Sequence, residues 1–505
     1  MDICTQRGAT VLIYASQLGA NVYFGTSNRG ARSIAHPRLE LYKVIMYDNF
    51  CQSRQIHLKG CASTRYIPHF IFAMTPPMPI FCTRRTDFGG VSLVNLAERF
   101  GTPVFVYDAA VIRQRISELK QFDVIRYAQK ACSNIAILQL MRSEGVLVDS
   151  VSANELRRAM TAGYAIDGAT PDAPTPIVYT ADIFDRDSLA LVLEKNVHVN
   201  CGSTDMIRQY GEALQKPQFA GNRREMTLRI NPGFGHGHSQ KTNTGGPQSK
   251  HGIWHEQLDE CIALAGKFGL TITGLHMHIG SGTDLKHLAQ CCGVMEQFAL
   301  KVGSSVVNIS TGGGLPVPYN AEQSYADTDE FFSLWDASRK RLEEQFGRRV
   351  TLETEPGRYL VAESCLLLAE IRAVKRQGEN TFYLLDAGFT NLARPIMYGA
   401  YHPISVVHRQ AKDNVPEQEV VVGGPLCESG DIFTQEEGGY VARRKLPVVE
   451  VGDYLALEAA GAYGSVMGSN YNSKPHAAEV LIDRGEARLI RRRQSFEHLI
   501  ANEIM

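Results

Sequence analysis

The sequence has 505 residues, of which 44% are hydrophobic and 21% are charged, and its formal net charge is -1. These values are typical of a globular protein with about two domains, and they give no electrostatic reason to expect binding to nucleic acid or to an acidic membrane surface. No apolar run reaches the roughly 18 residues that a membrane-spanning helix needs. The 11 cysteines include no CxxC pair, which predicts a reduced, cytoplasmic protein rather than a disulfide scaffold.

Residues 1–73 differ from the rest of the chain because they are rich in arginine and lysine and poor in acidic residues. A basic, acid-poor leader is typical of a transit peptide, but this one is long and shows no clear amphipathic helix. The sequence therefore predicts a poorly ordered extension, or an upstream start preceding Met74. A targeting role stays open as the alternative.

The first regular elements are expected between residues 93 and 108. A helix is expected over 93–100, and glycine and proline in 101–103 end it. An apolar strand is expected over 104–107, and Asp108 is expected to cap the helix that follows it.

From residue 124 the chain repeats a short β-branched strand, a turn and a helix, with helices expected over 153–162 and 188–194. This rhythm predicts a parallel sheet with crossover helices, and about eight such units favour a closed (β/α)8 TIM barrel over an open sheet. The expected strands are the one leading into Lys130, then 146–151, 177–179, 197–200, 226–231, 271–276, 306–310 and 350–355.

After about residue 361, strand-like runs follow one another with few helices, which predicts a second, antiparallel β domain of barrel or sandwich form. Its expected strands are 366–371, 382–385, 419–422, 446–451, 454–457 and 479–482. The predicted organisation is an extension (1–73), a lead-in associated with the β domain (74–108), a barrel (109–360) and a C-terminal β domain (361–505).

Active sites of such barrels lie at the C-terminal ends of the strands, and the polar residues of this chain gather there. Lys130 is expected on one strand face with Ala128 beneath it, where it can reach into a cavity. A desolvated lysine has a depressed pKa, so its amine is free to form a Schiff base with an aldehyde. A solvated lysine at a strand end is the more ordinary arrangement, so other residues must support the assignment.

A glycine triplet, Gly312 to Gly314, directly follows another strand. Glycines let backbone N–H groups close on an oxyanion, although the same run also suits a simple turn. His276 and His278 end a neighbouring strand and share a face. They can stack on an aromatic ring, sit as ordinary core histidines, or hold zinc in a barrel hydrolase.

Further candidates lie at turns. Glu355 and Arg358 could be a local salt bridge, or anchors for a ring nitrogen and an anionic group. Cys427, beside Glu428, could transfer a proton, although an isolated cysteine is more often structural. The remaining candidates, each an ordinary surface side chain when taken alone, are Arg394, Tyr398 and Tyr463.

From about Leu93 to the C-terminus the chain resembles the diaminopimelate decarboxylases, pyridoxal-phosphate enzymes of the alanine-racemase fold type. The match is particularly close to the bacterial subgroup that carries the run 231–238. The stretches that carry the resemblance are 127–131, 276–281, 312–315, 355–358, 386–388, 394–395, 401–403, 427–431, 461–464 and 469–473.

The resemblance implies a role for each residue at the cofactor. Lys130 is expected to form the Schiff base with pyridoxal 5'-phosphate, His278 to stack on its ring, and Glu355 to keep the ring nitrogen protonated. The glycine triplet is expected to hold the phosphate together with Ser281. Further residues expected at the cofactor are Asp149, Gly312, Gly313, Gly314, Pro356, Gly357, Arg358 and Tyr463.

The resemblance also implies the substrate site and the assembly. Cys427 is expected to donate a proton, and Cys427 and Glu428 are expected to come from the partner subunit of a homodimer with shared active sites. No metal is expected. The residues expected at the substrate are Arg358, Arg394, Tyr398, Glu428 and Tyr463.

The implied reaction is decarboxylation of meso-2,6-diaminopimelate to L-lysine, the last step of lysine biosynthesis by the diaminopimelate route. Decarboxylation of arginine, ornithine or another diamino acid stays open within the same class. A cofactor-binding barrel without catalysis and a zinc hydrolase built on the histidine pair are the alternatives from other classes.

Overall fold

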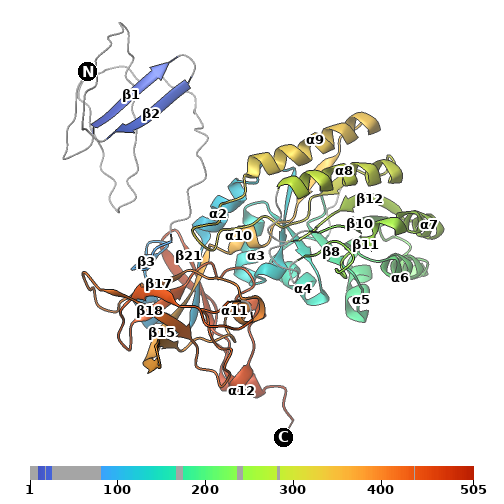
Figure 1. Cartoon of the computed structure of the whole chain (residues 1–505). Coiled ribbons are helices and arrows are strands. Elements are labelled where there is room, and N and C mark those ends of the chain that lie inside the picture. The colour runs from blue at the N-terminus through green and yellow to red at the C-terminus, as the bar shows by residue number, and fades with distance from the viewer. Residues whose placement is uncertain are drawn as a thin grey trace, which may run out of the picture. The chain divides into compact units, whose positions relative to one another are not determined.

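The computed structural model describes residues 10–16, 19–25, 81–166, 174–235, 243–280, 285–436 and 438–504. The chain divides into two compact units, Met1–Ala73 and Met74–Met505. In the first unit, β1 (Thr10–Ser16) pairs antiparallel with β2 (Gly19–Gly25) (Figure 1). These strands are not among the elements expected from the sequence, and the rest of the predicted extension lies outside the described residues.

The second unit contains the closed parallel barrel that the sequence predicts. Its strands are hydrogen-bonded in the order β6-β7-β8-β9-β10-β12-β13-β14, and β14 pairs with β6 to close the ring. They are β6 (Val124–Ala128), β7 (Leu147–Ser150), β8 (Ile177–Ala181), β9 (His198–Cys201), β10 (Glu225–Asn231), β12 (Thr271–His276), β13 (Asn308–Ser310) and β14 (Thr351–Thr354). The eight-strand prediction is therefore confirmed.

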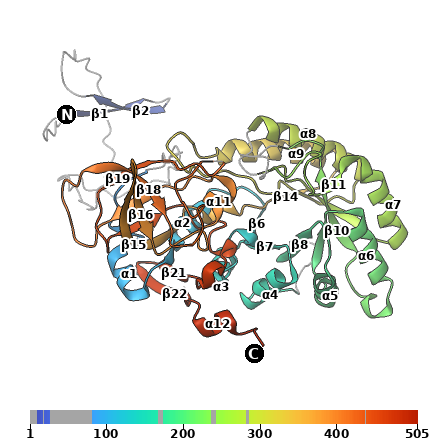
Figure 2. The same cartoon turned by 60° about the horizontal axis from the view of Figure 1, so that its bottom comes forward.

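Helices surround these strands, and Figure 2 shows α4 to α9 following one another around the outside of the ring. They are α3 (Ile135–Ser143), α4 (Ala153–Thr161), α5 (Arg186–Lys195), α6 (Thr204–Leu214), α7 (Leu258–Phe268), α8 (Leu285–Val302) and α9 (Thr328–Phe346). A short strand, β11 (Ile253–Trp254), pairs with β10 outside the ring.

Polar side chains cap the N-termini of the helices that follow the strands. Asn134 accepts a hydrogen bond from the backbone N–H of Ala136 at 2.9 Å, and Asp185 accepts one from Ser188 at 2.6 Å. Each such cap stabilises the start of a helix by about 1 kcal/mol. Asp108 caps α2 (Ala109–Ser117) in the same way, as the sequence predicts.

The β domain is built around the long strand β15 (Cys365–Gln377). This strand pairs antiparallel with β5 (Val104–Asp108), β16 (Asn380–Leu385) and β20 (Tyr454–Leu457). The other strands are β17 (Ile404–Val407), β18 (Glu417–Gly423), β19 (Arg444–Pro447), β21 (Ala478–Asp483) and β22 (Glu486–Arg491), with the short β3 (Asp87–Phe88) and β4 (Val91–Ser92) at the start of the unit.

The sheet of the β domain differs from the prediction in detail. Most pairs are antiparallel, but β5 pairs parallel with β21, and β16 pairs parallel with β18. The strand expected over 446–451 instead spans Arg444–Pro447. Strands β17 and β22 are additional to the expected set.

Strand β5 joins the two parts of the unit because both of its faces are buried. Phe105 and Tyr107 belong to the large core that continues into the barrel, whereas Val104 and Val106 pack in a second core with α1 (Leu93–Phe100). The alternation follows from the two-residue period of a strand. The β domain is thereby fixed beside the C-terminal ends of the barrel strands.

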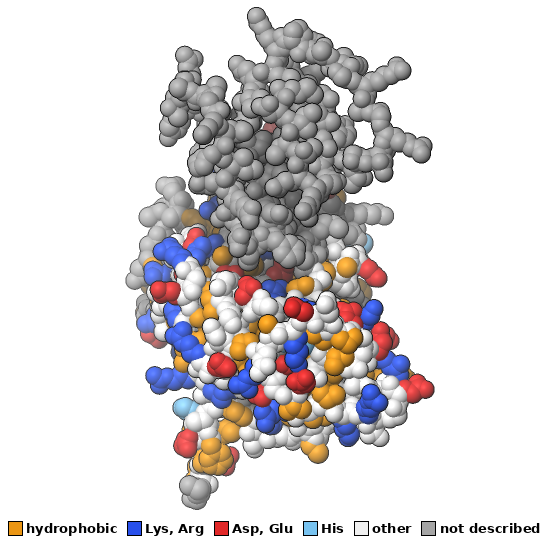
Figure 3. All heavy atoms as spheres, turned by 90° about the vertical axis from the view of Figure 1, so that its left-hand side faces the viewer, with side chains coloured by type: hydrophobic (Ala, Val, Ile, Leu, Met, Phe, Trp, Pro, Cys, Tyr) orange, Lys and Arg blue, Asp and Glu red, His pale blue; other side chains and the backbone are white. Residues whose placement is uncertain are grey.

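The described surface is mixed in charge. Figure 3 shows basic and acidic side chains interspersed over the described part of one face. Among the described residues, no helix combines the length and apolarity needed to cross a membrane.

Candidate active site

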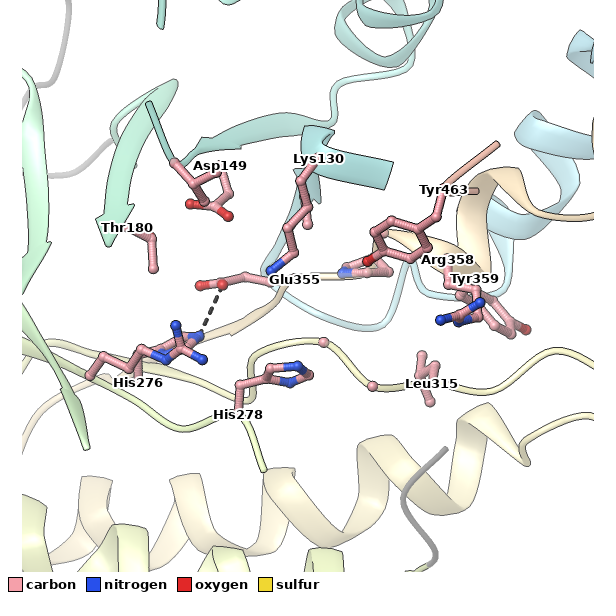
Figure 4. Close-up of a pocket in the computed structure, with 17 residues that line it drawn as sticks. Lys130, Asp149, Thr180, His276, His278, Leu315, Glu355, Arg358, Tyr359 and Tyr463 are labelled. Atoms are coloured by element: carbon pink, nitrogen blue, oxygen red, sulfur yellow. Dashed lines mark ion pairs between the residues drawn. The ribbon is translucent and has the colours of Figure 1, made fainter. Parts of the chain in front are cut away.

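A pocket lies where the C-terminal ends of the barrel strands meet the start of the β domain. The space between its lining atoms is about 590 Å³, open solvent at its mouth included. The residues that line it are Ala128, Lys130, Asp149, Val151, Thr180, Arg229, His276, His278, Gly313, Gly314, Leu315, Glu355, Pro356, Gly357, Arg358, Tyr359 and Tyr463 (Figure 4).

Lys130 reaches the pocket from a turn rather than from a strand. Strand β6 ends at Ala128, and residues Gln129–Ala131 form a 3-10 turn. The buried amide of Gln129 donates to the hydroxyl of Ser150 at 2.7 Å and to the carbonyl of Glu155 at 3.1 Å. Lys130 is exposed in the single chain, which corrects the prediction of a desolvated strand residue. Figure 4 shows its amine extending toward Glu355.

Glu355 is held as a buried carboxylate by two donors. Its Oε1 accepts a hydrogen bond from the hydroxyl of Ser310 at 2.7 Å, and its Oε2 lies 3.0 Å from Nε2 of His276. Burial alone raises the pKa of a carboxyl, but His276 and Ser310 outweigh burial here and lower the pKa of Glu355 to about 2. The pocket therefore presents a fixed negative charge.

Asp149 is a second buried carboxyl in the same pocket with the opposite tendency. Burial and the charge of Glu355 raise its pKa to about 6. Its Oδ1 atom has no hydrogen-bond partner among the described residues. The pKa values of the two acids are thus shifted in opposite directions, so Glu355 is ionised and Asp149 is easily protonated.

The glycine triplet lies against His278 and the strand ends. A Cβ on Gly313 would lie 2.6 Å from the carbonyl oxygen of Glu355, and one on Gly314 would lie 2.4 Å from that of Gly280. Gly314 also has φ +113°, where side chains are strained. Only glycine can bring this backbone so close to the pocket.

Burial lowers the pKa of His278 well below its ordinary value, so its ring is neutral.

Tyr463 and Arg358 close the side of the pocket next to the β domain. Arg358 starts the short helix α10 (Arg358–Val361), and its guanidinium carbon lies 5.0 Å from the centre of the Tyr463 ring. Tyr463 has φ +56°, and its N–H donates to the carbonyl of Ala131 at 2.8 Å. This hydrogen bond ties Tyr463 to the turn that carries Lys130.

Comparison with known proteins assigns this constellation to a family. The family model described as pyridoxal-dependent decarboxylase, pyridoxal binding domain, matches residues 109–362. The diaminopimelate decarboxylase of Escherichia coli (strain K12) is 50% identical over 432 residues, which cover 85% of this chain and 100% of the relative. The chain belongs to the diaminopimelate decarboxylase family.

Other members of the family agree with this assignment. The diaminopimelate decarboxylase of Streptomyces coelicolor is 50% identical over 416 residues, covering 82% of this chain and 92% of the relative. A diaminopimelate decarboxylase crystal structure with 51% identity has a TM-score of 0.77, covering 81% of this chain and 96% of the other. The Helicobacter pylori diaminopimelate decarboxylase complexed with L-lysine has 29% identity and a TM-score of 0.70, and the match covers 81% of this chain and 98% of the other.

The pocket residues fit the pyridoxal phosphate that this family of decarboxylases binds. The primary amine of Lys130 lines the pocket. The backbone of Gly313 and Gly314 also lines it, with no side chain to keep a ligand away. Three further polar atoms of lining residues, Nδ1 of His276, Nδ1 of His278 and Nε of Arg358, are buried without a hydrogen-bond partner among the described residues. Unpaired buried polar atoms are costly, so a ligand with several polar groups suits this site.

Most of the residues expected at the cofactor are brought together in this pocket. Gly312 stands just behind its lining, where the N–H of Gly312 donates to the hydroxyl of Ser310 at 3.2 Å. Ser281 lies outside the described residues. The residues that line the pocket as expected are Lys130, Asp149, His278, Gly313, Gly314, Glu355, Pro356, Gly357, Arg358 and Tyr463.

Four residues expected to act in the site do not line the pocket of the single chain. Arg394 is buried behind it, and Tyr398 ends the short helix α11 (Arg394–Tyr398). Cys427 and Glu428 are exposed, and the N–H of Cys427 donates to Asn472 at 2.8 Å.

The histidine pair raised the alternative of a zinc site. His276 is engaged with Glu355, and among the described residues no group of three or more His, Cys, Asp or Glu could hold a metal ion. Thr180 and Arg229 also line the pocket and were not expected there. Their only signal in the sequence is a position near the C-terminal end of a barrel strand.

Proposed function

We propose that this enzyme decarboxylates meso-2,6-diaminopimelate to L-lysine and CO2, the last step of lysine biosynthesis by the diaminopimelate route. The observation that carries the proposal is the pocket in which Lys130, His278, Glu355 and the glycine loop converge in a chain 50% identical to diaminopimelate decarboxylases. Solved lysine/ornithine and arginine decarboxylases, at 21% and 16% identity, share only the fold.

Pyridoxal phosphate, when bound, supplies the electron sink for the electrons released as CO2 departs. Lys130 would hold it covalently through its amine, which stands exposed at the pocket wall. Glu355, ionised and fixed by Ser310 and His276, keeps a proton on the ring nitrogen. The neutral imidazole of His278 supports the ring face, and the glycine loop receives the phosphate on its backbone.

Substrate recognition rests on the cations at the β-domain side of the pocket. Arg358 and Arg394 bind carboxylate, and Tyr398 and Glu428 contact the far end of the substrate. The thiol of Cys427 delivers the proton that replaces CO2, and Tyr463 keeps the substrate against the cofactor.

The enzyme acts as a homodimer in which Cys427 and Glu428 complete the partner's site. The support is their exposure and their place outside the pocket of their own chain, although the reaction needs a proton donor inside it. We also propose a cytoplasmic location, because all eight described cysteines are free thiols.

Incubation of the purified enzyme and pyridoxal phosphate with meso-diaminopimelate tests the function. One CO2 and one L-lysine are expected per substrate consumed, with far slower turnover of arginine and ornithine and none by Lys130→Ala. Faster release of CO2 from ornithine or arginine than from meso-diaminopimelate would contradict the assignment.

A further inference from the structure

Two guanidiniums at the pocket have no carboxylate to balance them among the described residues. Arg358 comes from α10 and Arg394 from α11, and no described Asp or Glu lies within ion-pair distance of either. Arg394 is only 7% exposed, and Nε of Arg358 is buried without a hydrogen-bond partner in the described part of the chain. Buried cations are costly without an anion, so this pair is suited to an anion supplied by a ligand.

Tyr319 lies between the two guanidiniums. Its hydroxyl accepts a hydrogen bond from Arg358 at 2.9 Å, and its ring centre lies 4.6 Å from the guanidinium carbon of Arg394. The loop that carries Tyr319 starts at the glycine triplet, and the N–H of Tyr319 donates to the side chain of Gln323 at 2.7 Å. The ring is thus fixed at its backbone, its face and its hydroxyl.

His402 holds Arg394 from the other side without adding a negative charge. Its Nδ1 lies 2.9 Å from the carbonyl oxygen of Glu458, which can only accept, so Nδ1 carries the proton. Its Nε2 then accepts from Arg394 at 2.8 Å. Burial, together with the charge of Arg394, lowers the pKa of His402 well below its ordinary value, so the imidazole stays neutral. The positive charge of Arg394 is therefore oriented but not neutralised.

We propose that Tyr319 is a positioning residue that sets the spacing of Arg358 and Arg394, so that the pair holds the carboxylate which decarboxylation leaves on the product. This inference rests on the proposed function and adds Tyr319 to the residues that determine specificity. It requires a ring with a hydroxyl at this position, because the ring supports one guanidinium and the oxygen fixes the other.

The charge balance around Tyr319 supports the same role. Burial raises the pKa of a phenol, but here Arg358 and Arg394 outweigh burial and lower the pKa of Tyr319 below its ordinary value. The local field is therefore strongly positive, as a site for carboxylate requires.

Tyr319→Phe removes the hydroxyl and keeps the ring, and Tyr325→Phe is its matched control. The Tyr325 hydroxyl also bonds a charged partner, donating to Glu363 at 2.6 Å, and its ring also faces an arginine, with the Arg115 guanidinium carbon 4.3 Å from the ring centre. Neither tyrosine lines the pocket, but Tyr319 accepts a hydrogen bond from Arg358, which does line it. The two substitutions therefore differ in the site that they touch.

The test measures KM and kcat for meso-diaminopimelate, and inhibition by L-lysine and by cadaverine, which lacks the carboxylate. In Tyr319→Phe, KM and the inhibition constant of L-lysine are expected to rise about tenfold, while kcat changes less than about threefold and cadaverine inhibits as before. Tyr325→Phe is expected to behave as the unaltered enzyme does in all four measurements.

Three results would overturn the inference. They are an unchanged L-lysine inhibition constant in Tyr319→Phe, an equal loss for L-lysine and cadaverine, and weaker binding of pyridoxal phosphate with unchanged L-lysine binding. The last result would show that Arg358 and Arg394 bind the cofactor rather than the carboxylate of the product. If Tyr319→Phe turns over too slowly, calorimetric titration with L-lysine gives the same comparison. Failure of the unaltered enzyme to release CO2 from meso-diaminopimelate would instead refute the proposed function.

Discussion

Nε2 of His276 lies 3.0 Å from Oε2 of Glu355, and this contact joins the end of one barrel strand to the turn after another. Because Ser310 donates to the other oxygen, both oxygens of the carboxylate have a donor. The charge of Glu355 is thus fixed before any ligand arrives, which is the preorganisation that electrostatic catalysis requires.

Ser310→Ala tests the support of that carboxylate. Loss of the hydroxyl is expected to raise the pKa of Glu355 toward its ordinary value and to lower the free energy of unfolding at neutral pH by about 1.5–3 kcal/mol, as for a hydrogen bond to a charged group. A carboxyl whose folded pKa is depressed adds stability above its unfolded pKa and loses it as pH falls toward about 2.

The difference in stability between Ser310→Ala and the unaltered enzyme should therefore shrink in urea titrations as pH falls from about 4.5 toward about 2. Ser364→Ala is the control, since the buried Ser364 hydroxyl donates to a neutral carbonyl, that of Val361, at 2.8 Å. A pH-independent difference for Ser310→Ala would show that the hydroxyl does not support a charge.

Asp149→Asn is expected to stabilise the protein, whereas Ser310→Ala is expected to destabilise it. A carboxyl whose folded pKa is raised lowers stability as pH increases from its unfolded pKa through its folded pKa of about 6. In the cofactor-free protein, Asp149→Asn should therefore increase the free energy of unfolding by about 1–2 kcal/mol at pH 8 and have little effect at pH 4. A stabilisation that is larger at pH 4 than at pH 8 would contradict the raised pKa.

Gly314→Ala tests the phosphate loop. The new Cβ would meet the carbonyl oxygen of Gly280 at 2.4 Å, so the loop must move, and the affinity for pyridoxal phosphate is expected to fall at least about tenfold. Gly303→Ala is the matched control, because Gly303 also has a positive φ, +95°, but a Cβ added there would point into open space. Equal cofactor dissociation constants in fluorescence titrations of the two variants would show that the loop does not bind the cofactor.

Shared active sites can be tested by mixing two inactive variants, Lys130→Ala and Cys427→Ala. If each site combines Lys130 of one subunit with Cys427 of the other, random mixing should restore about a quarter of the unaltered activity. Each variant alone should be nearly inactive, and Cys427→Ala should keep its cofactor. Absence of recovery in mixed dimers verified by mass spectrometry would argue that both residues serve the same subunit.

The sequence predicts the barrel well because its signals are local. The barrel strands are short apolar runs, and the helix cap that the sequence predicts, Asp108, ends β5 directly before α2. Strand β22 escapes prediction because three of its six residues are charged and none is buried, so it has no long apolar run. The parallel pairing of β5 with β21 joins segments far apart in the chain, and no local pattern reports such a pairing.

The site shows the same division between local and distant signals. Lys130, the glycine triplet and Glu355 stand in recognisable local motifs at strand ends. The turn that carries Lys130 depends on hydrogen bonds from Gln129 to Ser150 and Glu155, which belong to the next strand and helix. Tyr319 has no motif of its own, and its place between two arginines exists only in the fold.

The proposed function depends most directly on the amine of Lys130 as the attachment point of pyridoxal phosphate. Borohydride reduction of the loaded enzyme, followed by digestion and mass spectrometry, identifies the residue to which the cofactor is attached. We expect one pyridoxyl group per chain, on the peptide that contains Lys130. A label on another lysine, or a loaded enzyme that takes up no label, would contradict it.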